Sequence, residues 1–476
     1  MASNASLEAL VPELNPLHPK VINLGAAETY AVITPRVKRL LETPEVRRIG
    51  NIRQLGLINL VYPGATHSRL EHALGTYAQA CEYIRALYYS RNDPMFRSIF
   101  GPAEFKAVLI AALLHDVGYY PLAHDLEDCK LWKRSGIGHE SYSVRIIRSK
   151  LASMIEKDWD ISVDGVVDVL SNVSQTFRAK ILRSIISGPI DADKLDYLLR
   201  DSMHLGLAYG NVIDKRWLLR NLTIVYGNNV PSGLAVTDKG RVSAESIAFA
   251  RYAMFTVAYW HHTVRAIKAM LGYAVGKISV KLDPDKHFDF FENMESVQLD
   301  TSCDPIASTD ARQLVWIRDK VDESGKAMID SLLERDLYKR VFVIDPSTEE
   351  TKSWHRRFQK ADNEFVENFR QRLEEHVKRV LPSQDLKASD PLPMVLVDVP
   401  KMEEVEELYY ATEKRENLLS QSSIVWKELA VGFSQSIGKV RIFTHPTFEK
   451  AIKKSISREK WISLIGSSME KQPIRQ

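Results

Sequence analysis

An apolar run that ends in a histidine and an aspartate places the tightest constraint on how this chain folds. The run covers residues 107–114, His115 and Asp116 follow it, and Gly118 ends the helical pattern. We therefore expect a buried helix with two polar side chains at its end. An ionised aspartate in such a place is costly without a partner, and a bound metal ion would satisfy it.

A second predicted helix carries another histidine at its start. Ser68 and Glu71 form a capping box, and the apolar residues that follow keep a spacing of three and four. This spacing puts His72 in the first turn, next to Arg69. An imidazole and a guanidinium are therefore expected to project together.

A third helix is expected after Asp191, whose residue type suits the N-cap position. Its buried stripe consists of leucines, namely Leu195, Leu198 and Leu199. A different face presents carboxylates, an ammonium group and a phenol, from Asp193, Lys194, Tyr197 and Asp201. Such an array suits a metal ion and a phosphorylated ligand.

Each of these histidines has a simpler interpretation when it is taken alone. A histidine at the end of an apolar helix is more often a structural residue than a metal ligand. Two histidines and two carboxylates at the edges of apolar helices are harder to explain by packing, because buried charges need partners. Carboxylate oxygen favours magnesium, and imidazole widens the choice to manganese, iron or zinc. The pattern therefore predicts a metal-dependent hydrolase.

Four ordered segments resemble the HD-domain phosphohydrolases, in particular the branch that contains the sterile-alpha-motif and HD-domain deoxynucleoside triphosphate triphosphohydrolase. The segments are residues 62–72 (YPGATHSRLEH), 114–118 (LHDVG), 138–140 (GHE) and 191–202 (DADKLDYLLRDS). The similarity runs from about Thr43 to Arg340, and none is seen beyond it. The resemblance implies a mainly α fold, with a helical HD core and a smaller α+β C-terminal region.

The resemblance also implies a ligand set and a nucleotide pocket. The metal ligands it implies are the four residues that the spacing favours, His72, His115, Asp116 and Asp193. The implied substrate contacts are Arg69 and Lys194 for phosphate, Gln54 and Asp201 for the sugar, and Tyr197 and Tyr259 for the pocket wall. Leu55 matches the leucine that crowds the sugar 2′ position, so a ribonucleotide would be excluded.

Two further histidines match the family's acid–base residues. They are His124 and His139, and Glu127 stands where the family has an aspartate that orients the first of them. The resemblance implies that water attacks the α-phosphorus with metal assistance, and we expect His139 to protonate the leaving oxygen. On its own, the His139-Glu140 dipeptide would suggest only a helix N-terminus.

The chain departs from the family pattern at three places. Tyr119 and Tyr120 follow Gly118, so one active-site histidine and one small residue are lost. Gly50 replaces an arginine that helps to bind an activating nucleotide between subunits, so activation of that kind is not expected. His262 stands where the family usually has lysine, and it would be a weaker, pH-sensitive cation.

The resulting expectation is a triphosphohydrolase that cleaves dNTP to deoxynucleoside and triphosphate. The ion would be manganese, magnesium, iron or zinc, and the family resemblance implies a homo-oligomer, either a dimer or a tetramer. Two alternatives stay open. The chain could be an HD phosphohydrolase or nuclease that acts on another nucleotide or on nucleic acid, or it could be an HD regulator that senses nucleotides.

Composition fits a cytoplasmic enzyme with no membrane association. The 476 residues are 45% hydrophobic, and the net charge of +3 does not mark a dedicated nucleic-acid protein. Three cysteines, Cys81, Cys129 and Cys303, lack paired spacing, which favours reduced thiols over a zinc ribbon. The N-terminus has no basic region followed by an apolar stretch, and no run reaches membrane-spanning length.

We expect four segments along the chain. They are an N-terminal segment (1–35), an HD phosphohydrolase domain (36–280), a helical extension of the core (281–345) and an α+β C-terminal region of unknown role (346–476). One long helix is expected from Ala244 to Ala274. Strands are expected at Lys339–Ile344, Met394–Val399 and Val440–Thr444, and a charged amphipathic helix at Glu364–Val380.

The tail from Lys439 to Gln476 combines nine lysines and arginines with three glutamates. Its aromatic residues, Phe443, Phe448 and Trp461, are interleaved with the cations. This combination could bind nucleic acid or an acidic partner surface, although such a run is more often the solvated face of a helix.

Overall fold

A computed structural model of the chain confirms the mainly α fold. It describes residues 6–25, 29–128, 139–225, 233–277, 309–382, 391–400, 406–411, 416–429 and 438–469. Cys81 is a buried free thiol, whereas Cys129 and Cys303 lie outside the described residues. None of the helices in these ranges is both long and apolar enough to cross a membrane.

Three helices form the centre of the HD core, namely α4 (Arg69–Tyr88), α6 (Pro102–Leu114) and α12 (Ala192–Leu205). The apolar run of α6 is buried along its whole length from Ala107 to Leu114, as its composition requires. The Ser68 hydroxyl caps α4, and the Asp191 carboxylate caps α12 by accepting a hydrogen bond from the Lys194 amide at 2.5 Å. Both predicted helix starts are therefore present.

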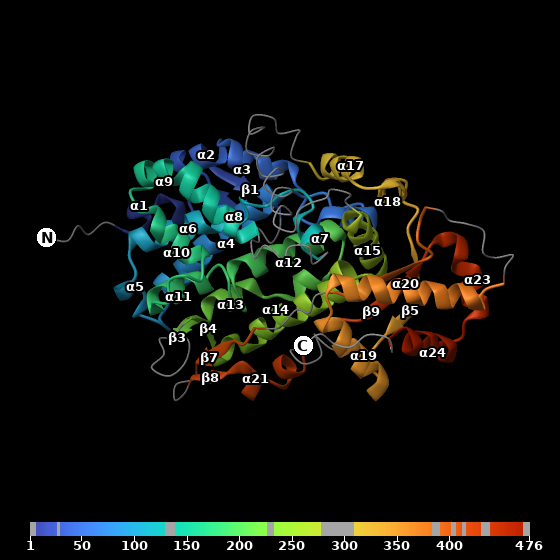
Figure 1. Cartoon of the computed structure of the whole chain (residues 1–476). Coiled ribbons are helices and arrows are strands. Elements are labelled where there is room, and N and C mark those ends of the chain that lie inside the picture. Colours follow the sequence, from blue (N-terminus) through green and yellow to red (C-terminus); the bar gives the residue numbers. More distant parts are fainter. Residues whose placement is uncertain are drawn as a thin grey trace.

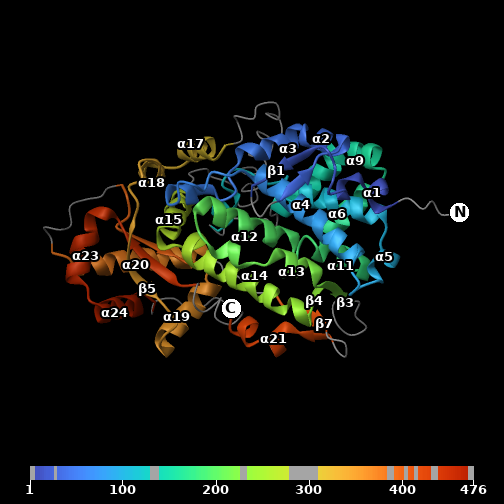
Figure 2. The same ribbon diagram turned by 180° about the vertical axis from the view of Figure 1, so that it is seen from behind.

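Shorter helices surround this centre (Figures 1 and 2). On the N-terminal side they are α1 (Leu7–Leu10), α2 (Pro35–Leu41), α3 (Pro44–Arg48), α5 (Phe96–Ile99), α7 (Ala123–Glu127), α8 (His139–Ile146) and α9 (Ala152–Trp159). Further along they are α10 (Val163–Leu170), α11 (Phe177–Ser184), α13 (Lys215–Arg220), α17 (Asp310–Lys320) and α18 (Glu323–Leu333). A two-stranded ribbon, β1 (Val21–Asn23) with β2 (Tyr30–Val32), lies near the N-terminus.

The long helix predicted over residues 244–274 is wrong, because the chain breaks within it. Helix α14 (Arg241–Met254) continues into a π-helical turn, Phe255–Tyr259, and a separate helix, α15 (His262–Gly276), begins after it. His261 has non-helical backbone angles, φ −52° and ψ 138°, and its ring accepts a hydrogen bond from the Thr263 amide at 3.3 Å. The histidine therefore acts as the N-cap of the second helix, a role that apolar periodicity does not reveal.

The C-terminal region contains a three-stranded antiparallel sheet, in the order β5 (Lys339–Ile344), β9 (Val440–Thr444) and β6 (Val395–Asp398). These strands coincide with the three predicted ones within one residue at each end. The surrounding helices are α19 (Glu349–Lys360), α20 (Asn363–Val380), α23 (Glu449–Ser455) and α24 (Arg458–Met469). Figure 1 shows this unit in orange and red, at the opposite end from the blue N-terminal helices.

Between β6 and β9 the chain returns to the HD core, where it completes a second sheet in the order β3 (Leu222–Val225), β4 (Gly233–Thr237), β7 (Tyr409–Ala411) and β8 (Glu416–Leu418). Strand β7 runs parallel to β4, with Val236 beside Tyr410. Leu408 and Trp426, near the short helix α21 (Leu419–Ser422), are buried in the main core. Part of the predicted C-terminal segment thus packs on the predicted HD domain, and the four-segment division itself stays a prediction.

A buried ion pair ties the three-stranded sheet to the helices. Arg265 of α15 donates to both carboxylate oxygens of Asp398 in β6, at 2.5 to 3.2 Å, and both residues are less than 5% exposed. Arg441 of β9 lies 3.7 Å from the same carboxylate. On its other side Arg265 reaches Asp128, which follows α7, at 3.2 Å.

We predict that Asp398→Ala destabilises the protein by about 3–5 kcal/mol, because it leaves two buried guanidinium groups facing each other without their shared carboxylate. Urea unfolding followed by fluorescence measures the change. Glu349→Ala is the matched control, since its pair with Lys352 is exposed to solvent and should contribute little to stability. Equal stability of the two variants would show that the Arg265 pair does not anchor the sheet.

Candidate active site

Three of the predicted metal ligands converge from three helices. His72 lies in α4, His115 follows α6 and Asp193 lies in α12, with their ligand atoms within 4.8 Å of one another. The Asp193 Oδ1 atom is 2.9 Å from His72 Nε2 and 3.6 Å from His115 Nε2. Nitrogen and oxygen ligands at about 2.0–2.2 Å from an ion are themselves about 3–3.5 Å apart. The spacing therefore fits one divalent cation.

Asp116 lies at the edge of the same group. Its Oδ1 atom is 3.3 Å from His115 Nε2, and its Oδ2 atom is 4.0 Å from His72 Nε2. Arg69 also donates to Oδ2 at 2.9 Å. The structure thus brings all four predicted residues together, with the Asp116 carboxylate shared between the imidazoles and a guanidinium.

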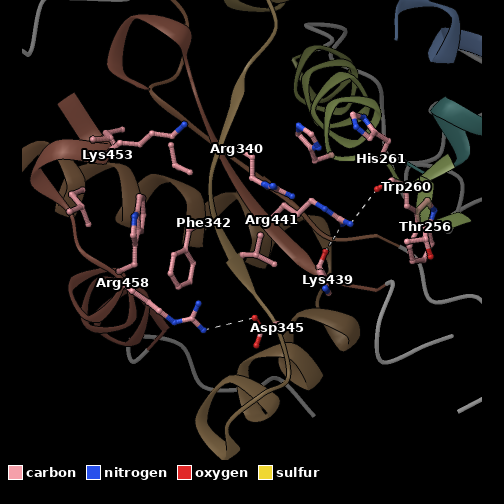
Figure 3. Close-up of a pocket in the computed structure, with 16 residues that line it drawn as sticks. Thr256, Trp260, His261, Arg340, Phe342, Asp345, Lys439, Arg441, Lys453 and Arg458 are labelled. Atoms are coloured by element: carbon pink, nitrogen blue, oxygen red, sulfur yellow. Dashed lines mark hydrogen bonds and ion pairs between the residues drawn. The ribbon is translucent and has the colours of Figure 1, made fainter. Parts of the chain in front are cut away.

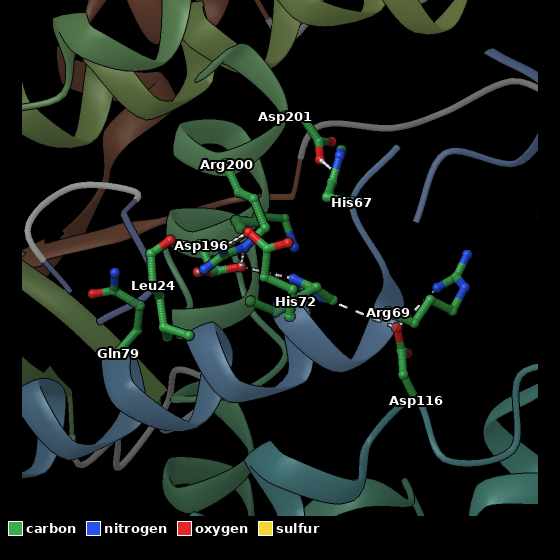
Figure 4. A network of polar contacts seen from close by, with 12 residues as sticks. Leu24, His67, Arg69, His72, Gln79, Asp116, Asp196, Arg200 and Asp201 are labelled. Atoms are coloured by element: carbon green, nitrogen blue, oxygen red, sulfur yellow. Dashed lines mark hydrogen bonds and ion pairs between the residues drawn. The ribbon is translucent and has the colours of Figure 1, made fainter. Parts of the chain in front are cut away.

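A second layer of contacts fixes the orientation of both imidazoles. His72 Nδ1 is 2.9 Å from Asp196 Oδ2, and Arg200 holds that aspartate with two hydrogen bonds of 2.9 and 2.7 Å (Figure 4). His115 Nδ1 is 2.9 Å from the Ala112 carbonyl oxygen. In both rings Nε2 is therefore the nitrogen directed at the candidate metal position.

Sequence reasoning missed Asp196 and Arg200. The signal was available, because an aspartate and an arginine four residues apart form an ion pair on one helix face. Gly75 of α4 allows the approach, since a Cβ there would collide with both side chains. Both residues are almost fully buried, which indicates that they stabilise the site rather than meet solvent.

The electrostatics of the group favour a cation at its centre. Burial opposes a charge on His72, but hydrogen bonds to Asp193 and Asp196 raise its pKa to about 10. Burial alone would raise the pKa of Asp193. Hydrogen bonds from His115 and His72 outweigh this effect and hold the pKa of Asp193 well below its ordinary value. Without a metal ion, a proton on His72 supplies positive charge between two carboxylates.

The predicted acid–base residues lie beside this group. His139 Nδ1 is 2.9 Å from Glu127 Oε1. Burial raises the pKa of Glu127, but the hydrogen bond with His139 outweighs it and lowers the pKa overall, so the carboxylate is ionised. The sequence prediction that Glu127 orients His124 is therefore wrong for this structure, because the longer glutamate side chain pairs with His139. His124 is bonded instead through Nε2 to the Tyr119 hydroxyl at 2.8 Å.

Asp201, one of the predicted sugar contacts, is hydrogen-bonded to two side chains. Its two carboxylate oxygens bind the Tyr259 hydroxyl at 2.6 Å and His67 Nε2 at 2.7 Å. The rings of Tyr259 and Tyr197 have centroids 6.5 Å apart. Gln54 is 7% exposed, and its Oε1 atom has no hydrogen-bond partner among the described residues. His67 was not predicted from sequence, although it lies within the quoted YPGATHSRLEH segment.

The two predicted phosphate contacts, Arg69 and Lys194, already have partners within the protein. Arg69 donates to Asp116 and, at 3.2 Å, to the Gln54 carbonyl oxygen, while its buried Nε finds no partner in the described part of the chain. Lys194 Nζ is 3.0 Å from Asp191 and 3.8 Å from Glu406. Leu55 is partly buried against the main core, next in sequence to Gln54.

A separate pocket of about 800 Å³ lies between the end of α14 and the three-stranded sheet (Figure 3). Its charged lining consists of Arg340, Lys439, Arg441, Lys453, Arg458 and Asp345. This excess of cations suits an anion. Burial and the neighbouring His261 lower the pKa of His262 to about 4, so His262 adds no charge near neutral pH. The pocket shares no residue with the metal-ligand group.

The aromatic residues of the predicted nucleic-acid-binding tail are not available to bases. Phe443, Phe448 and Trp461 are at most 3% exposed, packed within the core clusters. The stacking argument for the tail is therefore wrong, and binding of nucleic acid by its cations stays a prediction.

The chain matches two family descriptions. Residues 69–199 match the family described as HD domain, and residues 213–458, about half of the chain, match the family described as HD associated region. All four predicted metal ligands fall within the first match.

Curated relatives include uncharacterised proteins and proteins named as triphosphohydrolases. An uncharacterised protein of Methanocaldococcus jannaschii is 33% identical over 263 residues, which cover 55% of this chain and 50% of that protein. A Dictyostelium discoideum protein named deoxynucleoside triphosphate triphosphohydrolase SAMHD1 homolog is 24% identical over 344 residues, covering 69% of this chain and 61% of that protein. The matched region spans about half the length of the first two curated relatives.

Solved structures share the fold over nearly the whole chain. A phosphohydrolase from Bacteroides thetaiotaomicron superposes with a TM-score of 0.63 at 22% identity, covering 90% of this chain and 100% of that one. A hypothetical protein from Aquifex aeolicus gives a TM-score of 0.62 at 20% identity, covering 92% and 99%. At these identities the likeness shows the fold alone.

We predict that binding of Mn²⁺ releases at least one proton, because the proton that His72 holds below its pKa of about 10 must leave. The apparent affinity should rise about tenfold per pH unit between pH 6 and 9. Calorimetry in buffers of different ionisation enthalpy counts the protons. Asp193→Asn should abolish stoichiometric binding, whereas the exposed Asp164→Asn should not. Binding without proton release would contradict the assignment of His72 as a ligand.

Proposed function

The chain belongs to the HD-domain phosphohydrolases that carry an HD associated region, and we propose that it hydrolyses deoxynucleoside triphosphates to deoxynucleoside and triphosphate. The observation that carries this proposal is the adjacency of two clusters on α12. Asp193 near its start belongs to the metal-ligand group, and Asp201 two turns later belongs to the sugar-side cluster. A ligand bound along this helix would present its phosphates to the metal and its sugar to Asp201.

In the proposed reaction the metal is held by His72, His115 and Asp193, with Asp116 close by. When bound, the ion supplies Lewis-acid stabilisation of charge on the phosphate. Lys194 binds phosphate oxygens after exchanging its contact with Asp191. The negative charge of the phosphates would therefore be balanced by the Lys194 ammonium group and the metal ion.

His139 is the proposed proton donor. Its Nδ1 is hydrogen-bonded to the ionised Glu127, which leaves Nε2 as the atom that can deliver a proton to the leaving oxygen. His124 is hydrogen-bonded to the Tyr119 hydroxyl through Nε2, and it is not the proposed proton donor. Names of relatives support this function, since three of them are called deoxynucleoside triphosphate triphosphohydrolases.

A second candidate is hydrolysis of a different nucleotide by the same residues. Tyr119 and Tyr120 favour it, because both bulky side chains are buried next to the proton donor where the family resemblance leads us to expect smaller or different groups. The product and substrate experiments below distinguish the two candidates. An oligomer, dimer or tetramer, stays a prediction.

We predict that dATP, dCTP, dGTP and dTTP, each supplied alone with Mn²⁺, give a deoxynucleoside and intact triphosphate as products. The attack is proposed at the α-phosphorus, and Gly50 lacks the side chain expected for a guanine-nucleotide activator. Ion-exchange chromatography identifies the products. Release of orthophosphate or pyrophosphate would contradict the position of attack, and turnover that needs added GTP would contradict the regulatory expectation.

The predicted sugar contacts, Gln54 and Asp201, should make the enzyme distinguish substrates by the hydroxyl groups of their sugars. A 2′,3′-dideoxy substrate leaves the buried Gln54 oxygen and Asp201 without the 3′-hydroxyl, at a cost of about 1–3 kcal/mol. We therefore predict that its kcat/KM is lower than that of the dNTP by about one to two decades. Steady-state kinetics with matched bases measure the ratio. ATP hydrolysed as fast as dATP would rule out the proposed crowding of the 2′ position by Leu55.

A further inference from the structure

Tyr119 contacts several residues of the candidate active site, although it belongs to neither the metal-ligand group nor the cluster around Asp201. Its side chain is 2% exposed. The Arg69 guanidinium carbon lies 3.3 Å from the centroid of its ring. The ring of His139 lies 3.9 Å from it, tilted by 32°. The Tyr119 ring therefore contacts both Arg69, which is bonded to the predicted metal ligand Asp116, and His139, the proposed proton donor.

The hydroxyl of the same residue has a specific partner. It lies 2.8 Å from His124 Nε2. Burial raises the pKa of the Tyr119 phenol well above its ordinary value, so the hydroxyl keeps its proton and can donate it in this hydrogen bond. His124 and His139 have ring centroids 5.9 Å apart, and Tyr119 contacts both of them.

Arg69 extends these contacts to the metal side. It stacks on Tyr119 while it donates to Asp116 and to the Gln54 carbonyl oxygen. A guanidinium on an aromatic ring gains cation–π attraction, which is stronger where water is excluded. Movement of the Tyr119 ring would therefore disturb Arg69, and with it Asp116, as well as the two histidines.

We propose that Tyr119 is a positioning residue that holds His139 and Arg69 in the geometry needed for proton delivery to the leaving group. The role rests on the proposed phosphohydrolase function. Tyr119 acts through its neighbours, because its hydroxyl is engaged by His124 and its ring is covered. Its loss should lower kcat by a larger factor than it raises KM for the nucleotide.

A purely structural role makes different predictions. Tyr119 also packs with Leu57, Leu122 and Leu126 in a hydrophobic cluster. If packing were its whole contribution, a large-to-small substitution would lower the melting temperature, and the pH dependence of the remaining active enzyme would be unchanged. The pH profile therefore separates the two roles, because it reports the proton donor itself.

The test uses Tyr119→Phe, which removes the hydroxyl alone, and Tyr119→Leu, which removes the ring. Tyr338→Phe is the matched control, since Tyr338 is equally buried and its hydroxyl binds the Pro393 carbonyl oxygen at 2.5 Å, away from the site. We expect kcat to fall about tenfold or more in Tyr119→Leu with KM changed less than threefold, and the alkaline limb of the pH profile to move. Tyr119→Phe should retain more activity than Tyr119→Leu, and the control should match the parent.

A second measurement does not depend on turnover. In protein labelled with ¹³C at histidine Cε1, the His139 ring signal and its titration should change in Tyr119→Leu and persist in Tyr338→Phe. If the parent hydrolyses no nucleotide, the proposed function fails, and this signal still tests the positioning role. Unchanged His139 titration in Tyr119→Leu, or a loss of activity that follows the melting temperature with the pH profile intact, would overturn the proposal.

Discussion

The hydrogen bond between His72 and Asp196 is the interaction on which the candidate site depends. It joins α4 to α12, and it directs Nε2 of His72 at the point where His115 and Asp193 converge. Arg200 keeps the Asp196 carboxylate ionised and fixed by two hydrogen bonds, and Gly75 lets the helices come close enough for the contact. These buried contacts thereby fix the orientation of one of the three metal-ligand side chains, His72, relative to α12, which carries Asp193.

The HD associated region contributes to the same architecture through α15. Lys268 and Arg265 both bind Asp128, at 2.6 and 3.2 Å, at the end of the helix that carries His124 and Glu127. These contacts outweigh the effect of burial and lower the pKa of Asp128 to about 2. Because Arg265 also binds Asp398 in the three-stranded sheet, the acid–base helix and the sheet share one anchoring residue. The HD associated region is therefore part of the framework around the site.

Several features could be predicted from sequence because local patterns encode them. The capping residues Ser68 and Asp191, the buried run of α6 and the three C-terminal strands all lie where periodicity and turn chemistry indicate. What was missed is not encoded in apolar periodicity. The break at His261 comes from a local histidine cap, whereas the partner of Glu127 and the burial of the tail aromatics are decided by how the chain packs. Asp196 and Arg200 carried a visible helical pairing pattern, yet their connection to His72 exists only in three dimensions.

If His72, His115 and Asp193 bind one divalent ion, anomalous diffraction from crystals grown with Mn²⁺ will locate it. We expect a single strong anomalous peak within about 2.0–2.4 Å of His72 Nε2, His115 Nε2 and a carboxylate oxygen of Asp193. We also expect His72 Nδ1 to keep its contact with Asp196 in the metal-bound state. A well-ordered site with no peak there, in crystals that carry the ion elsewhere, would show that these three residues do not form the metal site.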